Sequence, residues 1–163
     1  YNSDIRTSER VFQLSQQVAG RAGRRKDRGK VFIQTYDVTN KLLENIINNK
    51  RNDFYEEELI LRKKASLPPY TKIASIILSG KKLDQLAVEA TNLKETLLRF
   101  KDLVILGPIP APIQYLQKEY RYRLLLKSNR PLLIQECLRR VNVKSKVSSN
   151  IRVKLDIDPY SFF

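Results

Sequence analysis

Two adjacent prolines, Pro68 and Pro69, interrupt the chain and limit how it can fold. Consecutive prolines cannot continue a helix, because each lacks a backbone N–H and its ring clashes with the preceding turn. We therefore predict a domain boundary at this point. One domain is expected over residues 1–66 and a second over 72–163, with a proline-containing linker over 67–71. With 163 residues, of which 42% are hydrophobic, the chain can build two small cores.

Strands and helices alternate after the prolines. Apolar, β-branched runs predict strands, and amphipathic spacing predicts helices. The predicted strands span 72–79, 103–106, 120–127 and 151–158, and the predicted helices span 83–100 and 131–141. The stretch from Gly107 to Pro112 contains three prolines and is predicted to be a stiff loop. The order β-α-β-β-α-β is the split βαβ or ferredoxin-like arrangement, which forms a four-stranded antiparallel sheet with two helices on one face.

The segment before the prolines is predicted to contain three helices and one strand. The helices are expected over about 8–24, 40–49 and 53–65, and the strand over 30–36. A single strand cannot form a sheet, so its neighbours are expected in another chain segment. The sequence also contains no Met and begins with a tyrosine. Both observations indicate a piece of a longer α/β protein.

The net charge of +14 is concentrated in two segments. Residues 21–30 carry an excess of five positive charges and residues 118–154 an excess of nine, which together account for the whole net charge. Such patches indicate anionic partners, with phosphate as the leading candidate. One Cys and no His exclude an intramolecular disulfide and a conventional zinc centre within this chain. No apolar run reaches the roughly 18 residues of a membrane helix, so no membrane partner is expected.

The sequence from Gln17 to Arg24, QVAGRAGR, carries the strongest functional signal. Arg21 and Arg24 lie three residues apart at a helix end. Gly20 and Gly23 permit the close approach of a phosphate-bearing neighbour. A guanidinium is always charged, binds phosphate oxygens bidentately and can stabilise charge that develops on a transferred γ-phosphoryl group. The same residues also fit a solvated helix end whose glycines form a turn.

This motif, Q-x-x-G-R-x-G-R, is similar to motif VI of superfamily 2 helicases, which lies in the second RecA-like lobe and faces ATP. The flanking residues resemble the PriA (primosomal protein N′) family of replication-restart helicases. The similar segments are Ser8-Glu9-Arg10, Phe12-Gln13-Leu14, Gly29 to Thr35, Asp53 to Arg62, Leu67-Pro68-Pro69, Gly107 to Pro112, Tyr120-Arg121-x-Arg123 and Leu155 to Pro159. They follow one another in order and cover essentially the whole chain.

The resemblance implies that the chain is the C-terminal part of an ATP-dependent 3′–5′ DNA helicase. Such a helicase recognises stalled or repaired forks and starts primosome assembly for replication restart. Residues 1–66 would form the end of RecA-like lobe 2. Residues 72–163 would form a C-terminal domain that binds DNA and partner proteins.

The resemblance also assigns nucleotide contacts. Arg21 and Arg24 are expected at the γ-phosphate of ATP, and Gln17 and Gly20 are expected to line the same site. The family's Walker A lysine, DExH box and zinc-binding cysteines lie upstream of this chain. The complete enzyme is therefore expected to use ATP and Mg²⁺ and to hold zinc upstream. The chain by itself is expected to bind none of these and to hydrolyse no ATP.

The partners that the resemblance implies are forked and single-stranded DNA, the acidic C-terminal tail of single-stranded DNA-binding protein, and other primosome proteins. The expected location is the bacterial cytoplasm, in association with the nucleoid. Arg130, which lies before a predicted helix N-terminus, is expected to receive the acidic tail together with Gln135. The predicted DNA contacts are Arg121, Arg123, Lys127, Arg139, Arg140, Lys144 and Lys146.

Tyrosine and arginine alternate at the start of the predicted strand 120–127. Tyr120 and Tyr122 therefore share one face of the strand, and Arg121 and Arg123 share the other. The arginines are expected on an exposed face, where they could follow a DNA backbone. The tyrosines are expected beneath the helices, with base stacking as the alternative.

Three further residues receive structural interpretations. Asp156 and Asp158 alternate near the end of the last predicted strand, without a wider set of metal ligands. We interpret them as strand-terminating and charge-pairing residues. Cys137 lies within the apolar run of its helix and is interpreted as a core residue.

Two non-enzymatic functions remain as alternatives. A basic ferredoxin-like sheet is also a scaffold for RNA recognition. The predicted strand 72–79 carries none of the aromatic residues that such a sheet uses for stacking. The remaining alternative is a module whose positive charge binds acidic peptides.

Overall fold

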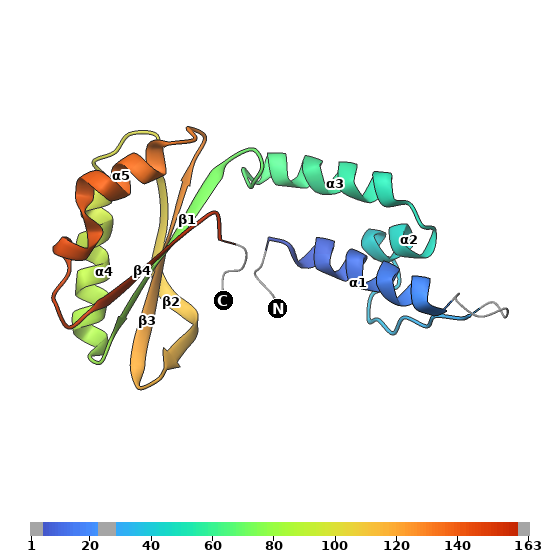
Figure 1. The fold of residues 1–163 in the computed structure, drawn as a ribbon, viewed down its shortest axis with the longest axis horizontal. Helices are drawn as coiled ribbons and strands as arrows, with labels where there is room; N and C mark the ends of the chain where they lie inside the picture. The colour runs from blue at the N-terminus through green and yellow to red at the C-terminus, as the bar shows by residue number, and fades with distance from the viewer. Residues whose placement is uncertain (1–4, 23–28, 160–163) are drawn as a thin grey trace. The chain divides into compact units, whose positions relative to one another are not determined.

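The chain separates into two units, Tyr1–Lys64 and Ala65–Phe163, at the end of its third helix. The computed structural model describes residues 5–22 and 29–159 (Figure 1). Pro68 and Pro69 lie close to the point of separation. Within the described residues, none of the helices has the length and apolar character that a bilayer crossing requires.

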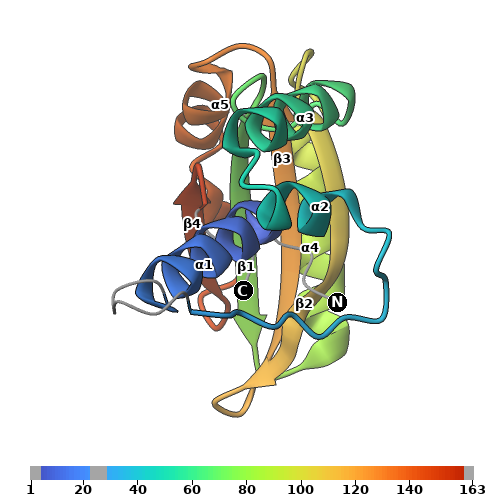
Figure 2. The ribbon, with the colours of Figure 1, turned by 90° about the vertical axis from the view of Figure 1, so that its right-hand side faces the viewer.

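The second unit contains the sheet that the sequence predicts. Its elements are β1 (Lys72–Gly80), α4 (Leu83–Leu97), β2 (Val104–Leu116), β3 (Glu119–Ser128), α5 (Leu133–Val141), the short 3-10 helix η1 (Val143–Lys146) and β4 (Arg152–Ile157). The strand order is β2-β3-β1-β4, and each neighbouring pair is antiparallel. Figures 1 and 2 show α4 and α5 together on one face of this sheet. The predicted element order and antiparallel sheet are confirmed.

A hydrophobic core fills the space between the sheet and these two helices. Alternate residues of the two central strands enter it, because successive side chains of a strand point to opposite faces. The core side chains include Ala74, Ile76 and Leu78 on β1, Leu124 and Leu126 on β3, Leu86, Leu93 and Leu97 on α4, and Ile134, Cys137 and Leu138 on α5. Burying one such leucine stabilises the fold by about 1.5–3 kcal/mol. Neither α4 nor α5 covers the opposite face of the sheet, and we call it the helix-free face. At its centre, Ile73, Ser75 and Ile77 of β1 are nonetheless buried.

The strand β2 is longer than the sequence predicts. The predicted loop from Gly107 to Pro112 is wrong, because β2 continues through it to Leu116. A proline lacks an N–H for the ladder and is tolerated on an edge strand; β2 is such an edge. Two register shifts against β3 accommodate the irregular segment. At Gly107, where φ is +95°, a Cβ would lie 2.6 Å from the carbonyl oxygen of Arg123, so glycine is required.

The alternation along β3 is also confirmed. Tyr120 and Tyr122 are half-buried and pack against the core, so they are not available as a stacking surface on the helix-free face. The intervening Arg121 and Arg123 point the other way, because their neighbours on both sides face the helices. The tyrosines thus contribute to packing, and the arginines belong to the helix-free face.

The regular elements described in the first unit are all helices. Its helices are α1 (Thr7–Ala22), α2 (Lys41–Ile47) and α3 (Arg51–Lys64). The strand predicted over 30–36 is wrong for this structure, since residues 30–36 have no regular secondary structure. A strand needs a hydrogen-bonded neighbour, and the described residues of this unit contain no second strand to provide one.

Aromatic rings hold the three helices of the first unit together. Phe12 of α1 stacks on Phe54 of α3, with 4.4 Å between ring centroids and 1° between ring planes. Ile46 of α2 completes the buried cluster. This core is small, so polar contacts between the helices contribute a larger share of the stability than they do in the second unit.

Candidate phosphate and partner sites

The motif residues that the structure describes lie at the C-terminal end of α1. Gln17 and Arg21 are exposed, and their i, i+4 spacing places them on one side of the helix. Arg21 lies in the last turn, where the helix dipole favours a cation. Gly23 and Arg24 lie outside the described residues. The structure thus presents Gln17 and Arg21 to solvent on one helix face.

The two described glycines near this end of α1 have different surroundings. A Cβ built on Gly20 meets nothing within 4 Å, so no described neighbour requires a glycine there. A Cβ built on Gly29 would overlap the carbonyl oxygen of Ala22. Gly29 therefore lets the chain return directly against the end of α1, a contact that the sequence pattern did not reveal.

A buried arginine braces the other end of α1. The side chain of Arg62 on α3 lies 3.0 Å from a carboxylate oxygen of Glu9 and 2.9 Å from one of Glu58. It also donates a hydrogen bond of 2.8 Å to the backbone carbonyl of Ile5. Arg62 is only 7% exposed, and a buried charge is tolerated when it is paired in this way. The arginine therefore ties the start of α1 to α3. Glu9 and Ile5 lie far from Arg62 in the sequence, so the sequence pattern did not reveal this contact.

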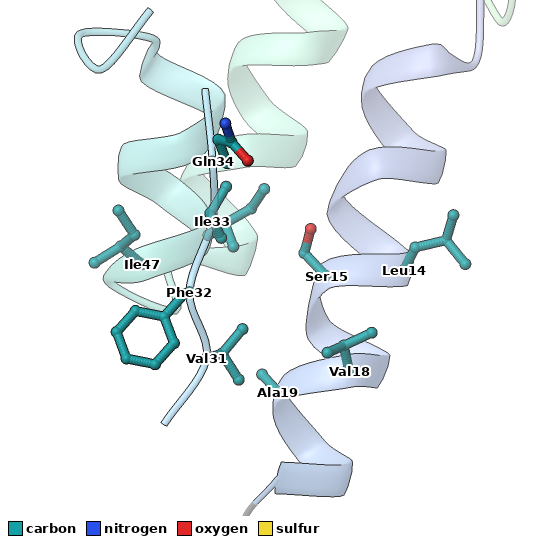
Figure 3. A pocket seen from close by; sticks show the side chains of 10 residues that line it. Leu14, Ser15, Val18, Ala19, Val31, Phe32, Ile33, Gln34 and Ile47 are labelled. Atoms are coloured by element: carbon teal, nitrogen blue, oxygen red, sulfur yellow. The ribbon is translucent and has the colours of Figure 1, made fainter. Parts of the chain in front are cut away.

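An apolar groove lies between α1, residues 31–34 and α2 (Figure 3). Its volume is about 540 Å³, and its walls include Val18 and Ala19 of α1, Val31 and Ile33 of the connecting segment, and Ile47 of α2. Several of these side chains are exposed, including Val18 at 55% and Ile47 at 72%. Gln17 and Arg21 do not line the groove. Its chemistry suits an apolar neighbour rather than a phosphate.

The predicted DNA-contacting residues fall into two groups on different sides of the second unit. Arg121, Arg123 and Lys127 lie on β3, on the helix-free face. Desolvation lowers the pKa of Arg123 from its ordinary value, and Lys127 donates a 3.1 Å hydrogen bond from Nζ to the carbonyl oxygen of Ala65. The other group comprises Arg139 and Arg140 in the last turn of α5 and Lys144 and Lys146 in η1, all exposed. The structure does not bring the two groups together.

The two residues predicted for an acidic tail lie at the start of α5. An Nη atom of Arg130 is 3.7 Å from a carboxylate oxygen of Asp102, and both side chains are more than 60% exposed. Gln135 is half-buried, and its Oε1 atom is enclosed without a hydrogen-bond partner among the described residues. A carboxylate accepts hydrogen bonds, so it would have to approach the amide nitrogen of Gln135 rather than this oxygen.

The predicted structural roles of Cys137 and Asp158 are confirmed. Cys137 is buried in the core, and burial raises the pKa of its thiol to about 11. A carboxylate oxygen of Asp158 pairs with Nζ of Lys72 at 3.0 Å, directly after β4 ends. Over residues 5–22 and 29–159, no cluster of three or more His, Cys, Asp or Glu side chains could hold a metal ion.

Comparisons with known proteins agree on one family. The family model described as primosomal protein N C-terminal domain matches residues 63–160. The chain is 36% identical to the replication restart protein PriA of Rickettsia conorii, over 99% of the chain and 25% of that relative. It is 34% identical to the PriA protein of Haemophilus influenzae, over 98% of the chain and 22% of that relative. It is 30% identical to the PriA protein of Bacillus subtilis, over 96% of the chain and 20% of that relative. The chain therefore spans a quarter or less of the length of these relatives.

Proposed function

Because the chain belongs to the primosomal protein N C-terminal domain family, we propose that it acts as the C-terminal part of an ATP-dependent 3′–5′ DNA helicase in replication restart. The observation that carries this proposal is the similarity of nearly the whole chain to proteins named replication restart protein PriA. The complete helicase would recognise stalled or repaired forks and start primosome assembly. It would act in the bacterial cytoplasm, in association with the nucleoid.

The first unit would form the end of a RecA-like lobe 2. Gln17, Gly20, Arg21 and Arg24 would line the ATP site, with the two arginines at the γ-phosphate. Their guanidinium groups would stabilise the charge that develops during phosphoryl transfer. The solvent exposure of Gln17 and Arg21 supports this role, because such residues must reach across a cleft to nucleotide held elsewhere. The apolar groove beside α1 is consistent with this role, because another segment of the same lobe could pack into it.

The second unit would bind DNA and partner proteins. Its strand order and its two helices support a ferredoxin-like domain. Arg121, Arg123 and Lys127 would contact DNA from the helix-free face, and Arg139, Arg140, Lys144 and Lys146 from α5 and η1. Arg130 and Gln135 would receive the acidic tail of single-stranded DNA-binding protein. Other primosome proteins would bind the complete helicase.

A binding assay with the 163-residue chain tests the DNA-binding part of this proposal. The chain should bind a labelled DNA fork, and the logarithm of the affinity should fall linearly with the logarithm of the salt concentration, because each phosphate contact releases counterions. It should hydrolyse no ATP, since the residues that hold the nucleotide and Mg²⁺ in this family lie upstream. Salt-independent binding, or ATP turnover by the isolated chain, would contradict the proposal.

An RNA arm and an acidic-peptide arm in the same assay test the two alternatives. Among the described residues of β1 and β3, the positions that face away from the helices hold no aromatic side chain. Sequence-specific RNA recognition on a sheet of this type depends on such side chains. A clear preference for single-stranded RNA or for the acidic peptide over forked DNA would favour the corresponding alternative.

A further inference from the structure

Two rows of cations cross the helix-free face on either side of β1. Ser79 of β1 is the register partner of both Arg121 on β3 and Arg152 on β4. Ile77, two residues earlier, is paired with Arg123 and Lys154. Directly opposite residues of an antiparallel sheet lie on the same face. Each row therefore holds one cation on each side of β1.

The intervening row fixes the direction of these side chains. Leu78 is the register partner of Tyr122 and Val153, and all three pack against the core beneath the helices. The rows before and after it must therefore face away from the helices. With about 4.8 Å between strands and about 3.4 Å per residue, cations within a row are about 10 Å apart and the two rows about 7 Å apart.

A hollow opens in this face beside the turn between β2 and β3. Its volume is about 320 Å³, and its polar lining consists of Ser79, Gln117, Glu119, Arg121, Arg152 and Lys154. Because one water molecule occupies about 30 Å³ of the liquid, this space would hold about ten waters. A phosphate group with part of its hydration shell fits such a volume. We call it the phosphate hollow.

One carboxylate partly neutralises the phosphate hollow. An oxygen of Glu119 lies 2.5 Å from an Nη atom of Arg152. The Glu119 side chain is only 17% exposed, whereas that of Arg152 is 72% exposed. The carboxylate is therefore held in the wall, and the guanidinium still presents most of its surface to solvent. Three cations against one carboxylate leave two positive charges in excess.

We propose that the phosphate hollow binds a backbone phosphate of DNA and that Glu119 competes with this phosphate for Arg152. This inference rests on the proposed DNA-binding function and deepens it by naming the face and the residues. In the unbound protein, Glu119 holds the guanidinium in place. When DNA binds, an N–H group of Arg152 that donates to Glu119 in the unbound protein donates to a phosphate oxygen instead. Arg121 and Lys154 supply the further positive charge.

The arrangement of the neighbouring cations favours a nucleic-acid strand over an acidic peptide. Beyond the hollow, Arg123 and Lys127 continue along β3 on the same face. Alternate residues of a strand are about 7 Å apart, which is close to two nucleotide steps of about 3.4 Å each along the helix axis of B-DNA. Leu125 lies between Arg123 and Lys127 on this face, so the cations of β3 are about 7 Å and about 14 Å apart. Cations at multiples of one spacing suit a polymer with regularly spaced phosphates. On β4, Asp156 opposite Ser75 ends the positive series.

Charge-removing substitutions test the phosphate hollow in the 163-residue chain. Fluorescence anisotropy with a labelled DNA fork would be measured over a range of salt concentrations. Arg121→Gln and Lys154→Gln should each weaken binding about eightfold at 0.1 M salt, the value for one lost phosphate contact. Each should also make the plot of log affinity against log salt concentration less steep by about 0.9. Glu119→Gln should tighten binding, because it removes the competing carboxylate. Circular dichroism would verify that each variant is folded.

Matched controls separate a local contact from the effect of net charge. Arg99→Gln and Lys101→Gln remove the same charges from exposed positions just after α4, and they should change affinity less than twofold. The proposal is overturned if these controls weaken binding as much as Arg121→Gln and Lys154→Gln do, or if Glu119→Gln leaves affinity unchanged or lower.

The same measurements distinguish this inference from the proposed function. Normal binding by the wild type, combined with normal binding by the hollow variants, overturns the phosphate hollow and leaves DNA binding by the chain intact. Absence of DNA binding by the wild type overturns both. Binding of an acidic peptide that is lost in Arg121→Gln, with no effect on DNA, would assign the hollow to a peptide instead.

Discussion

Replacing Arg62 by methionine should release α1 from α3 while leaving the second unit folded. Methionine keeps most of the length of the side chain but removes the charge, so two carboxylates and one backbone carbonyl lose their partner. The perturbation therefore acts on the contact that positions the helix carrying Gln17 and Arg21.

The structure sets the magnitude of this effect. Breaking a buried ion pair by removing one partner costs about 3–5 kcal/mol. Glu58 is 13% and Glu9 27% exposed, so both carboxylates can recover some hydration, and we expect the lower value of about 3 kcal/mol. A unit of this size has a total stability of about 3–10 kcal/mol. The substitution should therefore remove a third or more of the stability of the first unit.

Hydrogen exchange followed by mass spectrometry measures this loss segment by segment. A change of about 3 kcal/mol corresponds to a protection factor that is lower by roughly a hundredfold. This loss is expected in α1 and α3, whereas β1 and β3 should keep their protection. Lys64→Ala, an exposed change on the same helix, is the matched control and should have little effect. Unchanged protection of α1 in Arg62→Met would refute the bracing role.

Two further predictions concern the second unit and its strained or buried positions. Gly107→Ala should destabilise the chain by about 2 kcal/mol in urea denaturation, because alanine is strained at positive φ and its Cβ meets the Arg123 carbonyl. Gly20→Ala is the matched control and should be neutral or slightly stabilising, since its Cβ meets nothing; equal losses in both variants would contradict this reasoning. Burial raises the pKa of the Cys137 thiol to about 11, so the folded chain keeps this proton at a pH where the unfolded chain loses it. Stability should therefore fall between about pH 9 and 11, and Cys137→Ala should lack this component of the decrease.

The periodicity of the sequence was sufficient to predict the second unit. Its element order and the opposite faces of Tyr122 and Arg123 follow from local spacing, because a strand alternates with period two and a helix with period 3.6. The extension of β2 through Pro108 and Pro110 was not predictable in this way. Whether prolines end a strand depends on whether it lies at the edge of the sheet, which only the strand order decides.

The candidate sites were predictable to different degrees. The motif around Arg21 is a local pattern and was visible in the sequence, although Arg24 lies outside the described residues. Arg152 and Lys154 lie beside Arg121 only because β4 pairs with β1, so sequence distance concealed this cluster. The bracing role of Arg62 was not predicted, because its partners Ile5 and Glu9 lie at the start of the unit and Glu58 lies near its end. Its i, i+4 spacing to Glu58 was a local signal, but such pairs are common on exposed helix faces.

The most direct test of the central claim is DNA-stimulated ATP hydrolysis by the full-length helicase of which we propose this chain to be the C-terminal part. Arg21→Ala and Arg24→Ala would each be compared with the wild type. An arginine that stabilises the transferred phosphoryl group contributes about 10³-fold or more to the rate. Each variant should therefore lose about three orders of magnitude in turnover while binding forked DNA with unchanged affinity. Turnover at the wild-type rate in both variants would contradict the assignment of this chain to the ATP site of a replication-restart helicase.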